Sequence, residues 1–191
     1  HSSTTRLALL PPWSLEGGMA SLMPRLKGPR QRERIIGGIK DGIAGWENMV
    51  LHSGLDKIVI SSVQSTQRKG LEGKSIAQIA LEAQQDPFQL LLDLVEAENG
   101  AVSIITESMT EENMVRFLSL PFAMVGSDGS PNQGRPHPRL YGTFPRVIRR
   151  VVRELGVLSM EAAVHKMSGL PARRLALKDT GSLRKGFKAD A

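Results

Sequence analysis

The order of apolar segments in this 191-residue chain predicts an α/β fold. Three short runs, rich in β-branched or other apolar residues and bounded by turn residues, are typical of strands: Lys57–Val63, Ala101–Thr106 and Phe122–Gly126. Amphipathic segments of helical period lie between them. The strand–helix–strand order across the last two runs indicates a parallel β/α unit. We expect its apolar final strand to be buried on both faces.

The helices are expected from their period and their start signals. Apolar residues recur at helical spacing between Met19 and Ile43, but prolines and glycines there favour several short helices over one long helix. A further helix is expected over Phe144–Leu155, after a long polar loop at Ser127–Gly142. Four other helices each follow a residue whose side chain can cap the first turn: Ser75, Asp86, Thr110 and Ser159.

Composition narrows the class of protein. Hydrophobic residues make up 40% and charged residues 23%, as in soluble globular proteins. The absence of cysteine excludes disulfides and cysteine-based metal sites or nucleophiles within the chain. No apolar run approaches the roughly 18–20 residues of a membrane-spanning helix. We therefore expect a cytoplasmic protein with no membrane partner. The opening HSSTTRLALLPPW lacks signal-peptide features, and we expect it to have been cut from a longer chain.

The net charge of +6 raises the question of a nucleic-acid partner. Aromatic residues are only 4% of the chain, which argues against a base-stacking surface. Four arginines between Arg146 and Arg153 lie opposite the Val/Ile face of their predicted helix, so a solvated helix face is the better interpretation. We expect no nucleic-acid partner.

Asp128 is the first candidate catalytic residue. It follows the predicted strand Phe122–Gly126 directly, in the glycine-flanked turn GSDG. In barrel enzymes, catalytic residues lie where strands end at their carboxyl face. By itself the pattern is more typical of an ordinary turn. Downstream, the block GRPHPRLYGTFPR concentrates arginine, histidine, tyrosine and proline in one loop.

With these blocks in place, the chain resembles the N-acyl-D-amino-acid deacylase (D-aminoacylase) family of the amidohydrolase superfamily. The Gly134–Arg146 block is the most specific of the matching pieces. They occur in family order and span nearly the whole chain: Leu9–Trp13, Leu71–Ser75, Val125–Gly129, Gly134–Arg146 and Leu170–Asp190.

The resemblance implies the C-terminal part of a metal-dependent (β/α)₈ amidohydrolase barrel with an inserted helical segment. Residues 1–12 would be a barrel-edge loop and residues 13–95 the inserted, mainly helical segment. Residues 96–178 would supply the last barrel strands and helices with the catalytic loop. Residues 179–191 would begin a strand of a small β-domain.

The resemblance also implies roles for individual residues. Asp128 would accept the proton of a zinc-activated water and pass it to the leaving amine, and it is a candidate metal ligand. Arg139 would bind the α-carboxylate of an N-acyl-D-amino acid, with Arg135 as a weaker candidate. His137, held between two prolines, is a candidate substrate contact, with a structural role as the alternative. Ser3, with Ser2 beside it, is a substrate-side candidate.

The chain departs from the family in its metal site. It has no His-x-His and no cysteine, and a zinc site needs three or four ligands. We therefore expect the isolated chain to be inactive, and its partner to be the missing N-terminal part of the barrel or a second copy. Three alternatives stay open: another amidohydrolase acting on cyclic amides, as dihydroorotase and hydantoinase do; a catalytically dead structural remnant; and a basic nucleic-acid-binding domain.

Overall fold

The computed structural model describes residues 2–131 and 134–188, with the backbone alone described for residues 2–6. The chain forms two compact units. The first unit comprises His1–Ser108 and Pro131–His137, and the second comprises Met109–Ser130 and Pro138–Ala191.

A three-stranded sheet lies in the first unit. Strand β3 (Ser103–Thr106) is central, between β1 (Ser2–Thr5) and β2 (Ile58–Ser62), and it pairs with both neighbours in antiparallel fashion. Ile58, Ile60 and Ile104 are fully or almost fully buried, which explains the β-branched runs that predicted β2 and β3. The prediction that β3 belongs to a parallel unit is wrong, because its partners in the described residues are these two antiparallel strands.

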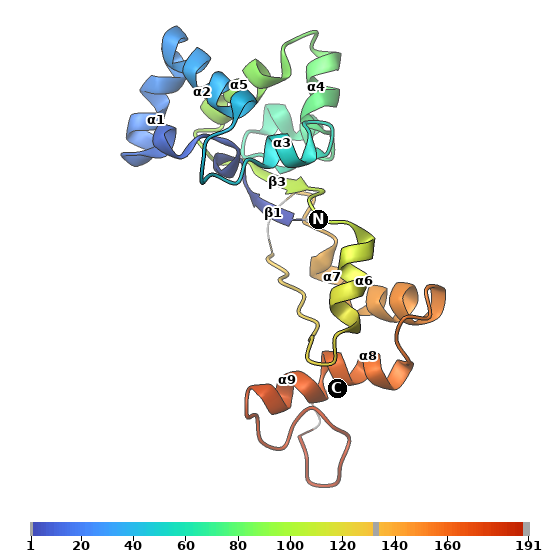
Figure 1. Cartoon of the computed structure of the whole chain (residues 1–191). Coiled ribbons are helices and arrows are strands. Elements are labelled where there is room, and N and C mark those ends of the chain that lie inside the picture. The colour runs from blue at the N-terminus through green and yellow to red at the C-terminus, as the bar shows by residue number, and fades with distance from the viewer. Residues whose placement is uncertain (1, 132–133, 189–191) are drawn as a thin grey trace. The chain divides into compact units, whose positions relative to one another are not determined.

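The helices of the first unit gather on one side of this sheet (Figure 1). Their apolar faces form one continuous core, in which α5 supplies five buried side chains from Leu90 to Val95. None of the described helices of the chain is long and apolar enough to cross a membrane. The helices of the first unit are α1 (Gly18–Lys27), α2 (Pro29–Asp41), α3 (Met49–Ser53), α4 (Ile76–Glu82) and α5 (Pro87–Ala97), with the short 3-10 helices η1 (Arg6–Leu9), η2 (Pro12–Leu15) and η3 (Thr66–Leu71).

Local start signals are confirmed where they were predicted. The Ser75 hydroxyl accepts a hydrogen bond from Gln78 N at 3.1 Å, and Asp86 caps α5 through two amides, with proline as the first helical residue. The expectation that prolines and glycines break the segment up to Ile43 is confirmed at Pro29, where α2 begins, but it is wrong for Pro24, inside α1, and for Gly37 and Gly38, inside α2. A Cβ on Gly38 would be 3.1 Å from Pro11 Cγ, so glycine permits close packing at this point.

Glu98 is a buried carboxylate that organises the chain after β2. Its side chain is 1% exposed and accepts hydrogen bonds from Gln64 N and Ser65 N, both at 2.9 Å. The Ser65 hydroxyl and Arg68 Nη1 donate to its other oxygen. Burial raises the pKa of Glu98, but these hydrogen bonds together bring it below its ordinary value.

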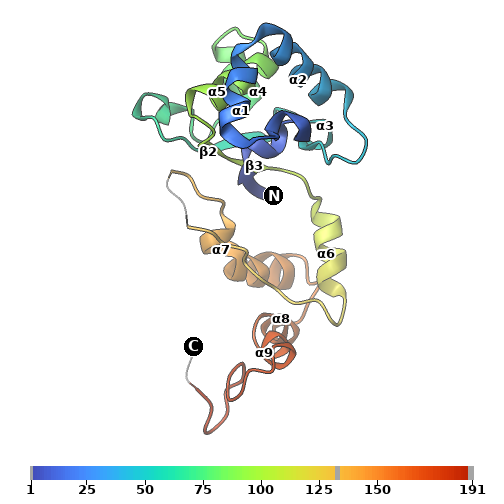
Figure 2. The same cartoon turned by 90° about the vertical axis from the view of Figure 1, so that its left-hand side faces the viewer.

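The second unit is helical (Figure 2). It contains α6 (Glu111–Ser119), α7 (Arg139–Arg146), the π-helix η4 (Val147–Glu154), α8 (Met160–Met167) and α9 (Gly169–Arg174). Its core is small, with Val147, Val151 and Ala163 buried and flanked by half-buried apolar side chains. Thr110 caps α6 and Ser159 caps α8, as predicted.

An arginine joins η4 to the start of α6. Arg150 makes two parallel hydrogen bonds to the Glu111 carboxylate, at 2.6 and 2.9 Å, and a third to Glu154 at 2.9 Å. These hydrogen bonds lower the pKa of Glu111 and raise that of Arg150. At least one arginine of the predicted solvated face therefore ties two helices together.

Two expectations for the second unit need correction. Phe122–Gly126 forms no strand, and Phe122 is 70% exposed rather than buried, because no described strand lies beside this segment to pair with it. The polar loop also ends early, since α7 begins at Arg139 rather than after Gly142.

We expect Glu98→Gln to lower the free energy of unfolding by about 1–3 kcal/mol, because an amide NH₂ replaces an oxygen that accepts from buried donors. A lowered pKa in the folded state means that the carboxylate stabilises fully above the ordinary glutamate pKa of about 4.3 and loses this effect as pH falls below it. The gap between wild type and variant should therefore shrink below that pH. Urea unfolding at several pH values measures it.

Glu47→Gln is the matched control, since it removes the same charge from an exposed position of the first unit. Equal losses of stability in the two variants would contradict the role given to Glu98.

Candidate active site

Asp128 lies in a tight turn of the second unit. Its φ of 47° is in the left-handed region, which aspartate tolerates better than most residues. The Ser127 hydroxyl accepts a hydrogen bond from Gly129 N at 3.2 Å and closes the turn. The Asp128 side chain is 85% exposed. The turn therefore presents a carboxylate that a small molecule can reach.

The turn lies against the start of α7. A Cβ on Gly129 would be 3.1 Å from Leu140 Cα, so only glycine fits without movement of the backbone. The close approach brings the residue after Asp128 beside the residue after Arg139. The GSDG block and the HPRLYG block, which are separate in the sequence, thereby meet in space.

Arg139 pairs with Asp128 across this contact. Its Nη2 lies 3.0 Å from Asp128 Oδ2, and its side chain is 21% exposed. Arg139 is the first residue of α7, where Thr143 Oγ1 donates a hydrogen bond to its carbonyl oxygen at 2.8 Å. The structure thus brings together the two residues that the sequence singled out first.

Arg135 lies in the first unit, beside β2. Its amide donates to Ser61 O at 2.9 Å, and the Ser61 hydroxyl donates to Arg135 O at 2.7 Å. Its guanidinium covers Gly73, where a Cβ would be 2.4 Å from Nη1. Arg135 is thus tied to the edge of the sheet, and its substrate-binding role stays a prediction.

The Arg135 charge acts on Glu72. Burial raises the pKa of Glu72, but hydrogen bonding to Lys69 and, more weakly, the charge of Arg135 bring it below its ordinary value. Arg135 therefore belongs to a local group of charges in the first unit.

The structure gives less support for site roles of His137, Ser2 and Ser3. His137 is half-buried in the first unit, and its role as a substrate contact stays a prediction. Ser3 pairs with Ile105 through the backbone of β1. The side chains of Ser2 and Ser3 lie outside the described part of the structure.

The residues near Asp128 do not fit a complete zinc site. Across residues 2–131 and 134–188, no three histidine, cysteine, aspartate or glutamate side chains come together as a metal site would require. The charged group paired with Asp128 is a guanidinium, a cation that repels a metal ion. Within the described residues, Asp128 has no further side chains beside it that would complete a zinc site.

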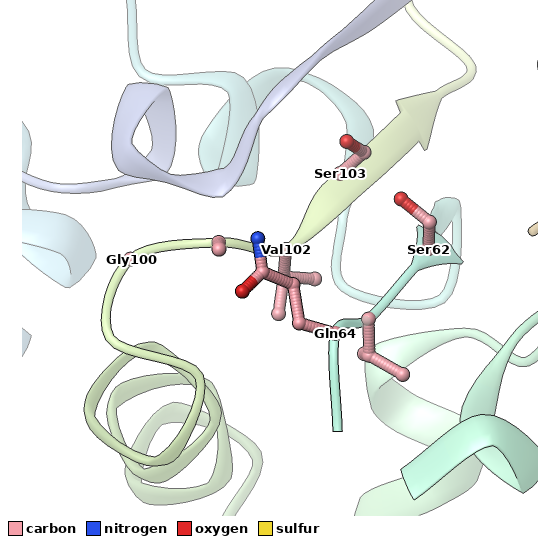
Figure 3. A pocket seen from close by; sticks show the side chains of 7 residues that line it. Ser62, Gln64, Gly100, Val102 and Ser103 are labelled. Carbon is pink, nitrogen blue, oxygen red and sulfur yellow. The ribbon is translucent and has the colours of Figure 1, made fainter. Parts of the chain in front are cut away.

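A surface pocket lies in the first unit, between the end of β2 and the start of β3 (Figure 3). Its volume is about 490 Å³, and its polar side chains are those of Ser62, Gln64 and Ser103. None of its lining residues carries a group that titrates, so it offers no acid or base for hydrolysis.

Sequence reasoning did not single out Lys166. This lysine is 5% exposed and lies on the buried side of α8, three residues after Ala163. A charged residue at the helical spacing of a buried face was the available signal. Its ammonium donates to the carbonyl oxygens of Leu120 and Ala123, in the segment before Asp128.

Comparison with known proteins identifies the family. Residues 69–191, which are more than half of the chain and include Asp128 and Arg139, match the amidohydrolase family. The chain belongs to the amidohydrolase family. The resemblance found in the sequence motifs is thereby confirmed, and the combination of helices with a small sheet fits its α/β class.

Two curated amidohydrolase relatives come from Alcaligenes xylosoxydans xylosoxydans. The chain is 40% identical over 120 residues to its D-aminoacylase, covering 63% of this chain and 24% of the relative. It is 43% identical over 126 residues to its N-acyl-D-glutamate deacylase, covering 66% of this chain and 25% of the relative. The chain therefore spans about a quarter of the length of these relatives.

Solved structures of an N-acyl-D-glutamate deacylase and of a D-aminoacylase also match this chain. An N-acyl-D-glutamate deacylase from Bordetella bronchiseptica, complexed with zinc and a phosphonate inhibitor, superposes with a TM-score of 0.62 at 37% identity. The match covers 71% of this chain and 27% of that one. A D-aminoacylase structure matches with a TM-score of 0.58 at 36% identity, over 70% of this chain and 27% of that chain.

We expect Asp128→Asn to lower the free energy of unfolding by less than about 1 kcal/mol, because an ion pair with so exposed a carboxylate is strongly screened by solvent. Asparagine also tolerates the left-handed backbone, whereas Asp128→Val should cost more because a β-branched residue is strained there. Thermal unfolding of both variants measures the difference. A loss from Asp128→Asn as large as that from Asp128→Val would contradict this account.

Proposed function

We propose that this chain supplies the proton-transfer carboxylate and the carboxylate-binding arginine of an N-acyl-D-amino-acid deacylase. The observation that carries the proposal is the pairing of Asp128 with Arg139 at 3.0 Å, inside the segment that matches the amidohydrolase family. Two relatives, which are 40% and 43% identical to the chain over 120 and 126 residues, are named D-aminoacylase and N-acyl-D-glutamate deacylase.

Asp128 supplies the acid–base chemistry. As water attacks the amide carbonyl carbon, a C–O bond forms and the Asp128 carboxylate accepts the proton that the water loses. The C–N bond then breaks, and the same proton passes from Asp128 to the leaving nitrogen. The products are a carboxylic acid and a free D-amino acid, and Asp128 returns to its starting state.

Arg139 recognises the substrate. An N-acyl amino acid has a free α-carboxylate, and the planar guanidinium fork can hold both of its oxygens. Without substrate, Arg139 pairs with Asp128. A substrate carboxylate that replaces Asp128 on Arg139 frees the Asp128 carboxylate to accept a proton beside the bound substrate.

In this proposal, the chain supplies only part of the enzyme, and the zinc ligands and the rest of the barrel come from other residues. The chain would form the last part of a (β/α)₈ barrel, with residues 13–95 as an inserted segment and residues 179–191 leading into a small β-domain. Zinc ligands would come from other residues, since those of the described chain do not form a complete site. Support comes from the family match and from the quarter of the relatives' length that the chain spans.

A second candidate is a catalytically inactive member of the family that acts by packing against another protein. The lack of a clustered set of metal-binding side chains among the described residues favours it. Once a metal site is supplied, the first candidate predicts hydrolysis that depends on Asp128 and Arg139, whereas the second predicts no hydrolysis.

A chimera separates them. Residues 69–191 replace the corresponding segment of the D-aminoacylase from Alcaligenes xylosoxydans xylosoxydans, which retains the rest of that enzyme. We expect hydrolysis of N-acetyl-D-amino acids, and little of the L-isomers or of a cyclic hydantoin. Asp128→Asn should lower kcat by about 10²–10⁴-fold, the usual contribution of a general acid–base.

Arg139→Lys in the same chimera should raise KM more than it lowers kcat, because lysine keeps the charge but loses the bidentate fork. Arg153→Lys, at an exposed position of η4, is the matched control and should change neither constant. A folded chimera that is inactive, or one indifferent to Asp128→Asn, would favour the inactive packing module.

The isolated chain is expected not to hydrolyse N-acyl-D-amino acids, because a single carboxylate cannot hold a catalytic zinc ion. Purified chain is incubated with N-acetyl-D-amino acids with and without added zinc, and the released amine is measured. Zinc-dependent turnover that disappears in Asp128→Asn would show that the chain holds a complete site after all.

A further inference from the structure

Lys166 is a buried cation that binds backbone oxygens. It lies on α8, is 5% exposed, and belongs with Ala163 to the helix face that packs in the second unit. Its Nζ donates to Leu120 O at 2.5 Å and to Ala123 O at 3.3 Å. Both acceptors lie in the segment that leads to Asp128.

The backbone of Lys166 holds the same segment. Val125 N donates to Lys166 O at 3.1 Å, and the Val125 side chain packs against the small core of the second unit. One residue therefore makes three hydrogen bonds to the chain between Leu120 and Val125. This stretch ends three residues before Asp128.

The chemistry of this contact is unusual for a core position. A buried ammonium is costly unless its donors are satisfied, and an apolar side chain of similar volume is often equally stable. No ion pair found among the described residues includes Lys166, whose two Nζ partners are neutral carbonyl oxygens. Packing alone therefore does not account for a lysine here, whereas fixing two carbonyl oxygens in place does.

The segment has few other constraints. Phe122–Gly126 forms no strand, and Phe122 and Met124 are exposed by 70% and 42%. The contacts of Lys166 and of the Val125 side chain thus fix the path of the chain up to the Ser127–Gly129 turn. Within this turn, Gly129 lies close to Leu140, and Asp128 pairs with Arg139.

We propose that Lys166 is the positioning residue of Asp128, holding the chain before it so that the carboxylate stands next to Arg139. This inference rests on the proposed function for its catalytic meaning. A shift of about 1 Å in a reacting group can lower a rate by about 10²-fold, so a clamp three residues before Asp128 is sufficient to matter.

The first test uses the 191-residue chain. Lys166→Met keeps most of the length of the side chain and removes its donors, whereas Lys166→Arg keeps the charge and the donors. Val151→Ala removes volume from the small core of the second unit and leaves the donors of Lys166 in place, and it is the matched control for lost stability. Amide hydrogen exchange at Val125 and Gly129 is followed by NMR, together with the guanidinium signal of Arg139.

We expect Lys166→Met to accelerate exchange at Val125 and Gly129 by at least about tenfold relative to the other amides of the second unit, and to shift the Arg139 signal. Lys166→Arg should recover most of the wild-type pattern. Val151→Ala should raise exchange evenly across the unit. If Lys166→Met does not fold, Lys166→Gln, which keeps a shorter donor, takes its place in the comparison.

The inference is overturned if the Met or Gln variant leaves exchange at these two amides and the Arg139 signal as in the wild type, or if Val151→Ala gives the same local pattern. The chimera provides the second readout, in which Lys166→Met should lower kcat at least about tenfold with KM within about twofold. A chimera that is inactive with Lys166 in place contradicts the proposed function, while the NMR result still decides whether Lys166 orders the segment.

Discussion

The second unit depends on how the chain before Asp128 is held, because no described strand lies beside this segment. Backbone N–H and C=O groups that have no sheet partner must be satisfied elsewhere. Here α8 takes the place of a neighbouring strand, since Lys166 binds two carbonyl oxygens and accepts the Val125 amide. In the inference drawn above, this contact sets the position of Asp128.

The two units of the chain reach stability in different ways. The first unit buries a continuous core of isoleucine, leucine and valine between its sheet and its helices, and a buried glutamate ties down the chain after β2. Among its described residues, the second unit buries only four apolar side chains, those of Val147, Val151, Ala163 and Ala172, and it leaves Phe117 and Phe122 largely exposed. Exposed apolar side chains of this size are typical of surfaces that pack against something further.

The candidate site joins the family relationship to a specific geometry. Membership of the amidohydrolase family rests on residues 69–191, and this stretch contains Asp128, Arg139 and Lys166. The carboxylate of Asp128 is exposed, the guanidinium of Arg139 is half-buried, and the ammonium of Lys166 is buried. In the function we propose, they are the reactive group, the substrate-recognising group and the support for the reactive group that acid–base hydrolysis requires of this part of an enzyme.

The sequence by itself determined what depends on near neighbours along the chain. The caps at Ser75, Asp86, Thr110 and Ser159 were readable because a capping side chain bonds to amides two or three residues away. The motif blocks likewise determined the family. Only the tertiary structure decided that Phe122–Gly126 forms no strand, that Arg139 pairs with Asp128, and that a lysine of α8 binds the segment before Asp128. These contacts join residues 11 to 46 positions apart, and no local pattern specifies which distant group will be there to pair.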